Sequence, residues 1–243
     1  MPDASSLRVK IFADGADRST ILTLAQNPAV RGFTTNPTLM RKAGVSDYEA
    51  FCREVLAAVP DRSFSFEVFS DDFDEMERQA TRIASWGQQV YVKVPITNTL
   101  AESAGPLIGR LASRGVKLNV TAIMTVSQVE IILPYLSGGP PSYVSVFAGR
   151  IADAGCDPVP LMRAVLDHIR PYPQIELIWA SPREVFNIVQ ADAIKCHIIT
   201  VTNDLLAKLP LLGRDLEDFS LDTVKMFRND AVAAGYKLSG RLA

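Results

Sequence analysis

The sequence predicts a single parallel α/β barrel of the (β/α)8, or TIM-barrel, class, followed by terminal helices. Short apolar runs of strand length alternate with longer amphipathic stretches about eight times along the chain, and this alternation is typical of a parallel sheet. The chain has 243 residues and no linker-like segment, and α/β barrels of roughly 250 residues fold as one domain. We therefore expect residues 1–243 to form one domain, with 203–243 as its terminal helices.

Eight apolar runs are the predicted strands. In chain order they are Arg8–Ala13, Gly32–Thr35, Phe64–Phe69, Val90–Val94, Lys117–Thr121, Tyr143–Phe147, Glu176–Ala180 and Ala193–Val201. Between them, amphipathic stretches such as Asp72–Trp86 and Pro158–Ile169 repeat apolar residues at helical spacing. Beyond the last strand we expect helices near Asn203–Lys208 and over Asp215–Ala234, packed on the barrel or on a neighbouring subunit.

The composition excludes several classes of protein. Hydrophobic residues make up 48% of the chain and charged residues 21%, and the formal net charge is −2. No basic patch of the kind that binds nucleic acid is visible, and no apolar run approaches the ~18 residues that a membrane span requires. We expect a cytoplasmic protein that binds neither nucleic acid nor membranes.

Cofactor and metal motifs are also missing from the sequence. The three cysteines are far apart and form no CxxC, and the two histidines, His168 and His197, have no ligand spacing suited to zinc. Neither GxGxxG nor GxxxxGK[ST] occurs, which disfavours a nucleotide cofactor. We expect no cofactor and no metal.

One predicted strand contains a lysine. Lys93 lies inside the apolar run Val90–Val94. Burial in such surroundings disfavours the charged ammonium, and a neutral amine can attack a carbonyl to form a Schiff base. The alternative is a lysine at a strand end whose ammonium reaches water or pairs with a carboxylate.

Polar residues gather at the carboxyl ends of the predicted strands, where barrels of this class carry their functional sites. In chain order they are Asp14, Thr34, Asn36, Glu67, Lys93, Asn119, Thr121, Ser145, Arg150, Ser181 and Arg183. We expect these side chains to converge on one mouth of the barrel.

Five segments at these strand ends resemble the class I transaldolases and the related small fructose-6-phosphate aldolases. They are, in the expected order, Phe33–Thr38, Val92–Pro95, Leu118–Ala122, Ser145–Ile151 and Trp179–Glu184. The resemblance covers nearly the whole chain. It implies a lysine Schiff base that moves a dihydroxyacetone unit from a ketose phosphate, fructose 6-phosphate or sedoheptulose 7-phosphate, to an aldose phosphate. Because relatives assemble into dimers or larger rings, it also implies a homo-oligomer.

The same resemblance implies catalytic roles. Lys93 matches the Schiff-base lysine, and Glu67 matches the carboxylate that moves protons together with Thr121 through a water. Asp14 matches the acid/base that acts on the sugar hydroxyl during cleavage. Two alternatives are structural: Glu67 as an ion-pair partner of Lys93 only, and Asp14 as a residue that caps the turn before glycine.

It implies binding roles as well. Thr34, Asn36 and Asn119 match substrate-binding side chains, Ser145 is expected near the dihydroxyacetone unit, and Arg150, Ser181 and Arg183 match a phosphate grip. Asn36 could instead be a turn residue, and Ser145 could be barrel packing. Ser181–Glu184 also predicts a helix start, with an N-cap serine and a capping box.

Two positions favour group transfer over free aldol cleavage. Phe147 stands where the fructose-6-phosphate aldolases carry tyrosine, and Glu67 stands where they carry glutamine. Two other interpretations stay open, an aldolase-like lyase and a noncatalytic sugar-phosphate binder. The segment Ala13–Gly15 also departs from the Leu-Asp-Thr or Leu-Asp-Ser of many relatives, which leaves the acceptor sugar open.

Overall fold

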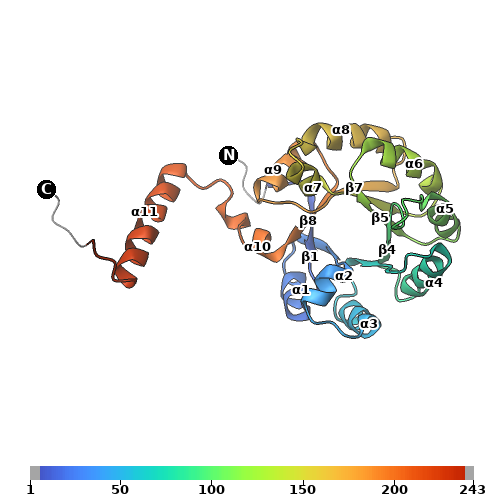
Figure 1. Ribbon diagram of the computed structural model, residues 1–243, viewed down its shortest axis with the longest axis horizontal. Coiled ribbons are helices and arrows are strands. Elements are labelled where there is room, and N and C mark those ends of the chain that lie inside the picture. The colour runs from blue at the N-terminus through green and yellow to red at the C-terminus, as the bar shows by residue number, and fades with distance from the viewer. Residues whose placement is uncertain (1–5, 239–243) are drawn as a thin grey trace.

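Eight parallel strands pair in chain order and close into a barrel, because β1 pairs with β8 as well as with β2 (Figure 1). A computed structural model describes residues 6–238. The strands are β1 (Lys10–Asp14), β2 (Val30–Thr34), β3 (Ser63–Glu67), β4 (Val90–Pro95), β5 (Leu118–Ile123), β6 (Ser142–Val146), β7 (Ile175–Trp179) and β8 (Ile198–Thr202). The predicted fold class is confirmed.

Helices surround the barrel, and several begin at an aspartate whose side chain accepts a hydrogen bond from a backbone N–H of the first turn, as Asp17, Asp47, Asp72 and Asp157 do. The helices of the barrel are α1 (Arg18–Ala25), α2 (Pro37–Lys42), α3 (Tyr48–Ala58), α4 (Phe73–Ala84), α5 (Gly105–Ser113), α6 (Val126–Leu136), α7 (Ala148–Asp153), α8 (Pro158–Ile169) and α9 (Phe186–Ala193).

All eight predicted strands overlap observed ones, and the largest error lies before β8. The sequence predicted a strand from Ala193, but this residue is the last of α9, and the strand begins at Ile198. Between them Lys195 adopts a left-handed backbone with φ of 61°. The apolar Ile194, Cys196 and Ile198 alternate with the polar Lys195 and His197, as residues of a half-buried strand do, so the pattern of residues marks no boundary there.

Inside the barrel, an apolar layer lies beneath a polar one. Phe12, Tyr91, Tyr143, Ile178 and Ile198 belong to one cluster in which the Tyr91 and Tyr143 rings stack at 3.9 Å. Side chains two residues apart on a strand share a face. The layer above these five residues therefore consists of Asp14, Lys93, Ser145, Ala180 and Thr200. The polar side chains of the upper layer therefore rest on packed aromatic rings and isoleucines.

The end of the chain leaves the barrel. After β8, α10 (Asn203–Leu206) still packs with Leu205 and Leu206 buried, and η2 (Leu209–Leu211) follows it. Helix α11 (Leu216–Ala233) extends away from the barrel and has no buried residue (Figure 1). Packing of 203–243 on its own barrel is therefore seen for α10 but not for α11, and residues 239–243 lie outside the described part. No described helix is long and apolar enough to cross a membrane.

Candidate active site

A small cavity of about 100 Å³ opens at the carboxyl ends of the strands. Of the residues that the sequence assigned to the site, all but Glu67 and Arg183 line it. The cavity is also lined by Phe147, Ala180 and Thr200. The side chains predicted from the strand ends therefore form a real cluster.

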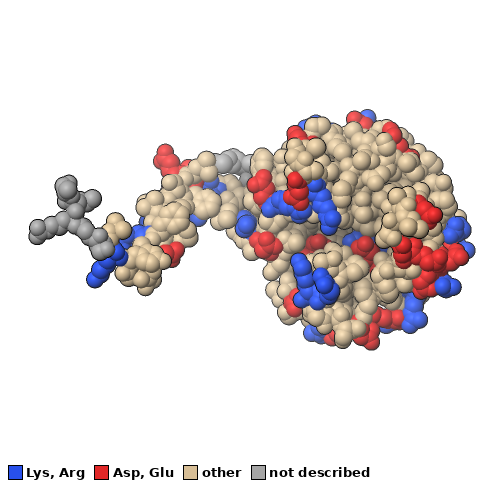
Figure 2. Space-filling view, viewed as in Figure 1, with Lys and Arg blue, Asp and Glu red and all other residues tan. Residues whose placement is uncertain are grey.

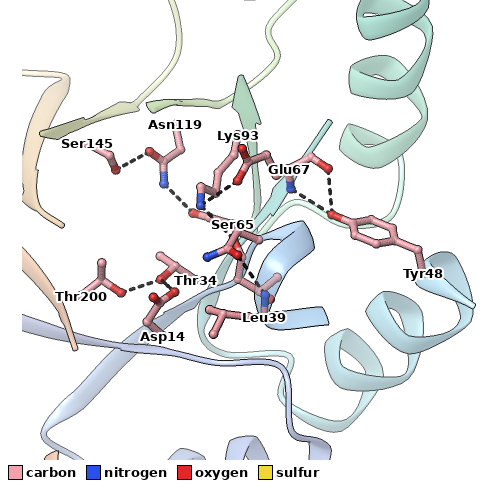
Figure 3. A network of polar contacts seen from close by, with 12 residues as sticks. Asp14, Thr34, Leu39, Tyr48, Ser65, Glu67, Lys93, Asn119, Ser145 and Thr200 are labelled. Carbon is pink, nitrogen blue, oxygen red and sulfur yellow. Dashed lines mark hydrogen bonds and ion pairs between the residues drawn. The ribbon is translucent and has the colours of Figure 1, made fainter. Parts of the chain in front are cut away.

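Lys93 lies in β4 and its side chain is 7% exposed. Its Nζ donates to the backbone oxygen of Thr35 at 2.8 Å and lies 3.0 Å from Glu67 Oε2 (Figure 3). The strand register explains the second contact, since Glu67 of β3 is directly paired with Lys93. A buried amine with a carboxylate beside it can exchange protons without moving either backbone.

The hydroxyl of Tyr48 holds the backbone of Glu67 in place. The Tyr48 hydroxyl donates to the Glu67 backbone oxygen and accepts from the Glu67 N–H, both at 2.9 Å (Figure 3). Tyr48 is the first residue of α3, so a helix outside the barrel fixes the end of β3. Tyr48 was not predicted from the sequence, because a tyrosine at a helix N-terminus carries no distinctive pattern.

Asp14 faces the cavity rather than the turn that comes after it. Its Oδ1 accepts from Thr34 Oγ1 at 2.7 Å, whereas Asp17 supplies the cap of α1. Burial raises the pKa of Asp14 above its ordinary value of 3.8, and the positive charge of Lys93 and the Thr34 hydrogen bond oppose this rise. A carboxyl group with a raised pKa suits a residue that both takes and returns a proton.

A second chain of hydrogen bonds crosses β3, β5 and β6. Ser145 Oγ donates to Asn119 Oδ1 at 2.7 Å, and Asn119 Nδ2 donates to Ser65 Oγ at 3.0 Å. Asn119 is fully buried, so these two bonds fix the orientation of its amide. Ser65 was not predicted, because a serine within the strand Phe64–Glu67 resembles ordinary packing.

Thr121 and Asn36 complete this side of the cavity. The buried Thr121 Oγ1 has no hydrogen-bond partner among the described residues. A buried hydroxyl in that state calls for a water or a ligand. Asn36 Oδ1 accepts from the Leu39 N–H at 3.0 Å and so caps α2. Asn36 is therefore a helix N-cap with an extended backbone rather than the turn residue of the structural alternative, and it also lines the cavity.

Gly149 brings the ends of β6 and β7 together. A Cβ at this position would lie 1.5 Å from the Ser181 backbone oxygen, so only glycine permits the approach. Arg150 is the next residue, and its guanidinium lies 5.4 Å from the centre of the Phe147 ring. The approach places Arg150 and Ser181 at the same rim of the cavity.

The predicted helix start at Ser181 is wrong. Ser181 has a left-handed φ of 60°, and α9 begins only at Phe186, with no side-chain cap. The Ser181 hydroxyl instead accepts from Arg183 Nη1 at 2.9 Å, and Asn187 Oδ1 accepts from the Arg183 and Glu184 N–H groups. Close packing against Gly149 sets this backbone, which a local capping pattern does not reflect.

Arg183 points to Asp153 rather than into the cavity. Its Nη2 lies 2.5 Å from Asp153 Oδ2, and its Nε donates to the same carboxylate at 2.9 Å. Both side chains are about half exposed, at 44% and 54%. Arg183 therefore lies beside the cavity, but its guanidinium is paired with a carboxylate of the same chain.

Basic side chains lie on two opposite sides of the hollow at the centre of the barrel face (Figure 2). Figure 2 shows Lys and Arg gathered over α2 and near α7 and α9, on opposite sides of that hollow. The exposed cations of these elements include Arg41, Lys42 and Arg150. Such a rim suits an anionic ligand.

Thr200 is the clearest site residue that was not predicted. It is 5% exposed, and its Oγ1 lies 2.5 Å from Thr34 Oγ1 (Figure 3). The available signal was the same as for Lys93, a polar residue in the middle of an apolar strand. Threonine is common in strands, so this signal did not stand out.

The described residues contain no group of three or more His, Cys, Asp or Glu placed to hold a metal ion. Cys52 and Cys196 are buried free thiols, and burial raises the pKa of Cys196 to about 12. His197 Nδ1 accepts from the Leu177 N–H at 3.0 Å, a contact that belongs to the barrel wall.

Comparison with known proteins gives a consistent result. The profile of the family described as Transaldolase/Fructose-6-phosphate aldolase matches residues 11–238. A Dehalococcoides mccartyi protein named "Probable transaldolase" is 33% identical over 88% of this chain and 97% of its own length. "Probable transaldolase 2" of Listeria monocytogenes is also 33% identical, over 88% of this chain and 95% of its own.

A further relative and a solved structure extend the comparison. "Probable transaldolase" of Streptococcus equi subsp. equi is 34% identical over 88% of this chain and 97% of its own length. A Burkholderia cenocepacia structure, assigned by its name to the phosphonomutases, superposes with a TM-score of 0.56 at 11% identity and covers 92% of this chain and 94% of that one. At such low identity the superposition supports the barrel fold alone.

Proposed function

Because the chain belongs to the transaldolase/fructose-6-phosphate aldolase family, we propose that it transfers a dihydroxyacetone unit from a ketose phosphate to an aldose phosphate. The donor is fructose 6-phosphate or sedoheptulose 7-phosphate, and the carrier is a Schiff base on Lys93. The observation that supports this most is the buried Lys93 amine, 3.0 Å from the Glu67 carboxylate at the wall of a polar cavity.

The first stage is formation of the iminium. The Lys93 amine adds to the ketose carbonyl, and the carbinolamine then loses water. Each step moves protons, and Glu67 is close enough to take one from the amine and return it to the departing hydroxyl. Thr121, whose buried hydroxyl lacks a protein partner within residues 6–238, would hold the water through which Glu67 acts.

The second stage is cleavage and transfer. Asp14 takes the proton of the hydroxyl on the carbon beyond the scissile bond, that bond breaks, and its electrons move into the iminium to give an enamine. The aldose leaves, and the enamine then attacks an acceptor aldehyde while Asp14 returns the proton. Water then hydrolyses the new iminium, which frees the ketose product and the Lys93 amine. The raised pKa of Asp14 supports the second half of this cycle.

The phosphate would bind at the rim. The cavity of about 100 Å³ is small, well below the ~300 Å³ at the lower end of drug-sized sites, so the phosphate end of a six-carbon sugar would extend toward Arg150 and Ser181. An arginine fork meets phosphate oxygens in pairs. Arg183 would contribute only after it exchanges the Asp153 carboxylate for the substrate phosphate.

Transfer is preferred to release of free dihydroxyacetone because Phe147 lines the cavity where a tyrosine would add a hydroxyl. An apolar ring offers no group to activate water, so the enamine would persist until an aldehyde arrives. An aldolase-like lyase is the second candidate, because the family description includes both activities.

Borohydride trapping tests the proposal. The protein is incubated with fructose 6-phosphate and sodium borohydride, and its intact mass and peptides are then measured. We expect a reduced three-carbon adduct on Lys93. If wild-type protein acquires no adduct from fructose 6-phosphate or sedoheptulose 7-phosphate, the Schiff-base proposal is wrong and a noncatalytic sugar-phosphate binder becomes the better account.

We also propose that α11 packs against a second copy of the chain. Its apolar side chains are widely exposed, for example Leu216 at 69%, Val224 at 60% and Phe227 at 64%. The family match extends through residue 238, so α11 belongs to the shared unit. A monomer would leave this apolar surface in water.

Light scattering after gel filtration tests the assembly. We expect an oligomer for the wild type and a smaller species for the double variant Phe219→Glu/Phe227→Glu. The matched control is Ser220→Glu, which adds a charge to the same helix without removing an apolar side chain. A monomeric wild type, or a double variant of unchanged size, would contradict the packing proposal.

A further inference from the structure

Two threonines connect the Asp14 carboxylate to the last strand. Thr200 Oγ1 lies 2.5 Å from Thr34 Oγ1, which lies 2.7 Å from Asp14 Oδ1. Closure of the barrel puts β1 between β2 and β8, so the carboxylate has a threonine-bearing strand on each side. Thr34 and Thr200 are 3% and 5% exposed, which largely excludes water from their contact.

The direction of these hydrogen bonds is set by the number of protons. An ionised Asp14 can only accept, so the Thr34 hydroxyl must donate to it. A hydroxyl has a single proton, and Thr34 then has none left for Thr200. Thr200 is therefore the donor in the contact between the two threonines. The result is a one-way chain from Thr200 through Thr34 to Asp14.

We propose that Thr200 is a positioning residue for the Asp14 base. By donating to Thr34, Thr200 fixes the Thr34 rotamer and polarises its O–H, which strengthens the bond to the carboxylate. The chain orients Asp14 and favours its ionised form, the form that takes a proton from a substrate hydroxyl. The role assigned to Asp14 rests on the proposed function, whereas the coupling of the three side chains does not.

The competing account is that Thr200 only fills space at the top of the barrel. In that account the volume of the side chain matters and its hydroxyl does not. Thr200→Val keeps the volume and removes the hydroxyl, whereas Thr200→Ser keeps the hydroxyl and removes a methyl group. The two variants therefore give opposite results under the two accounts.

Steady-state kinetics with fructose 6-phosphate and an aldose phosphate provide the first test. We expect Thr200→Val to lower kcat about tenfold, as a misplaced catalytic group does, with little change in KM. The acid limb of its pH profile should move to higher pH by about half a unit, because the ionised form loses support. Thr200→Ser should stay close to wild type. The proposal would be overturned if Thr200→Ser lowered kcat while Thr200→Val kept the wild-type kcat.

Thr202→Val is the matched control. Thr202 lies two residues further along β8, and its hydroxyl hydrogen-bonds to Asp204 instead of belonging to the Asp14 chain. We expect its kcat and pH profile to match the wild type. An effect as large as that of Thr200→Val would indicate a general disturbance of β8 and would count against the proposal.

A double variant tests whether Thr200 acts through Asp14. In the Asp14→Ala background, adding Thr200→Val should change the residual rate less than about twofold, because the group on which it acts is gone. A further loss of about tenfold would mean that Thr200 acts independently of Asp14, and the positioning role would be wrong.

Carboxyl ¹³C NMR gives a readout that needs no turnover. The Asp14 titration should move to higher pH in Thr200→Val but not in Thr200→Ser or Thr202→Val. If no donor sugar reacts with the wild type, the proposed function fails while this titration still decides the coupling. An Asp14 titration that is the same in all these proteins would refute the proposal.

Discussion

The two sides of the cavity are built differently. On the lysine side, Lys93, Glu67 and Asn119 lie on strands, are largely buried, and contact fixed neighbours. On the rim, Arg150 and Arg183 lie on segments after the strands, are exposed, and Arg183 is already bound to Asp153.

This difference matches the demands of the two tasks that the proposed function assigns to these sides. Covalent chemistry requires reacting groups to be held to a fraction of an ångström, which buried strand residues with satisfied hydrogen bonds can provide. Binding a phosphate tolerates adjustment, since two arginines can reorient on a surface. We therefore expect substitutions on the strand side to lower kcat and substitutions on the rim to raise KM.

The largest expected effect is that of Lys93→Ala. Without the amine no Schiff base forms, so turnover should fall by more than about a thousandfold, with an unchanged circular dichroism spectrum. Lys10→Ala is the control, because Lys10 is also a strand lysine paired with a glutamate, at 2.6 Å from Glu176, outside the cavity. A folded Lys93→Ala protein with full activity would remove the distinction between the two sides.

Asp14→Asn should lower kcat by about 10²–10⁴-fold, the usual contribution of a general acid/base. It should also stabilise the fold, because burial raises the Asp14 pKa and thus makes the ionised carboxylate unfavourable. Between pH 3.8, the ordinary pKa of aspartate, and the raised pKa of Asp14, the folded wild type binds more protons than the unfolded chain. Its free energy of unfolding therefore falls as the pH rises through this range. The melting temperature of the variant should exceed that of wild type increasingly over this range. Equal melting temperatures at all pH values would contradict the stabilisation.

Arg183→Ala should raise KM for phosphorylated donors by roughly 10–100-fold, the equivalent of one charge-assisted contact, with little change for dihydroxyacetone. Arg170→Ala is the control, since Arg170 also pairs with an aspartate, Asp167, but does not line the cavity. Equal losses for phosphorylated and free substrates would show that the rim is not specialised for phosphate.

Phe147→Tyr should have the smallest effect, a change of a few-fold in the ratio of free dihydroxyacetone to transfer product. The added tyrosine hydroxyl can activate a water that protonates the enamine, and hydrolysis of the resulting iminium then frees dihydroxyacetone. Phe147→Leu keeps the position apolar and should leave the ratio unchanged. Both products are measured in one assay by chromatography. If Phe147→Tyr leaves their ratio unchanged, Phe147 gives no reason to prefer transfer over release.

Features that depend on strand alternation and on strand ends were predicted from the sequence. Lys93 was found because a lysine in an apolar strand is rare, and the eight strands were found from the repeating pattern. Features set by long-range contact were not predicted. The Ser181 backbone depends on Gly149 of another loop, and the start of β8 depends on strand pairing rather than on local hydrophobicity.

The contacts of three further side chains could not be predicted from the sequence, for a related reason. Thr200, Ser65 and Tyr48 are ordinary residues for their strands and helices, and tertiary packing brings them to Thr34, Asn119 and Glu67, with only the contact of Thr200 requiring closure of the barrel. The exposed α11 was predicted as a helix, but its departure from its own barrel could not be inferred from its periodicity.

Closure of the barrel by β8 also bears on how the protein is made. Lys93, Glu67 and Asn119 come from three consecutive strands, so these residues can meet while the chain is still being synthesised. The contact between Thr34 and Thr200 joins residues 166 positions apart and must wait for the last strand. Contacts of such separation form late and slowly. A nascent chain that ends before β8 would then carry the lysine pocket but not the complete surroundings of Asp14, and full activity would appear only when the two ends of the sheet join.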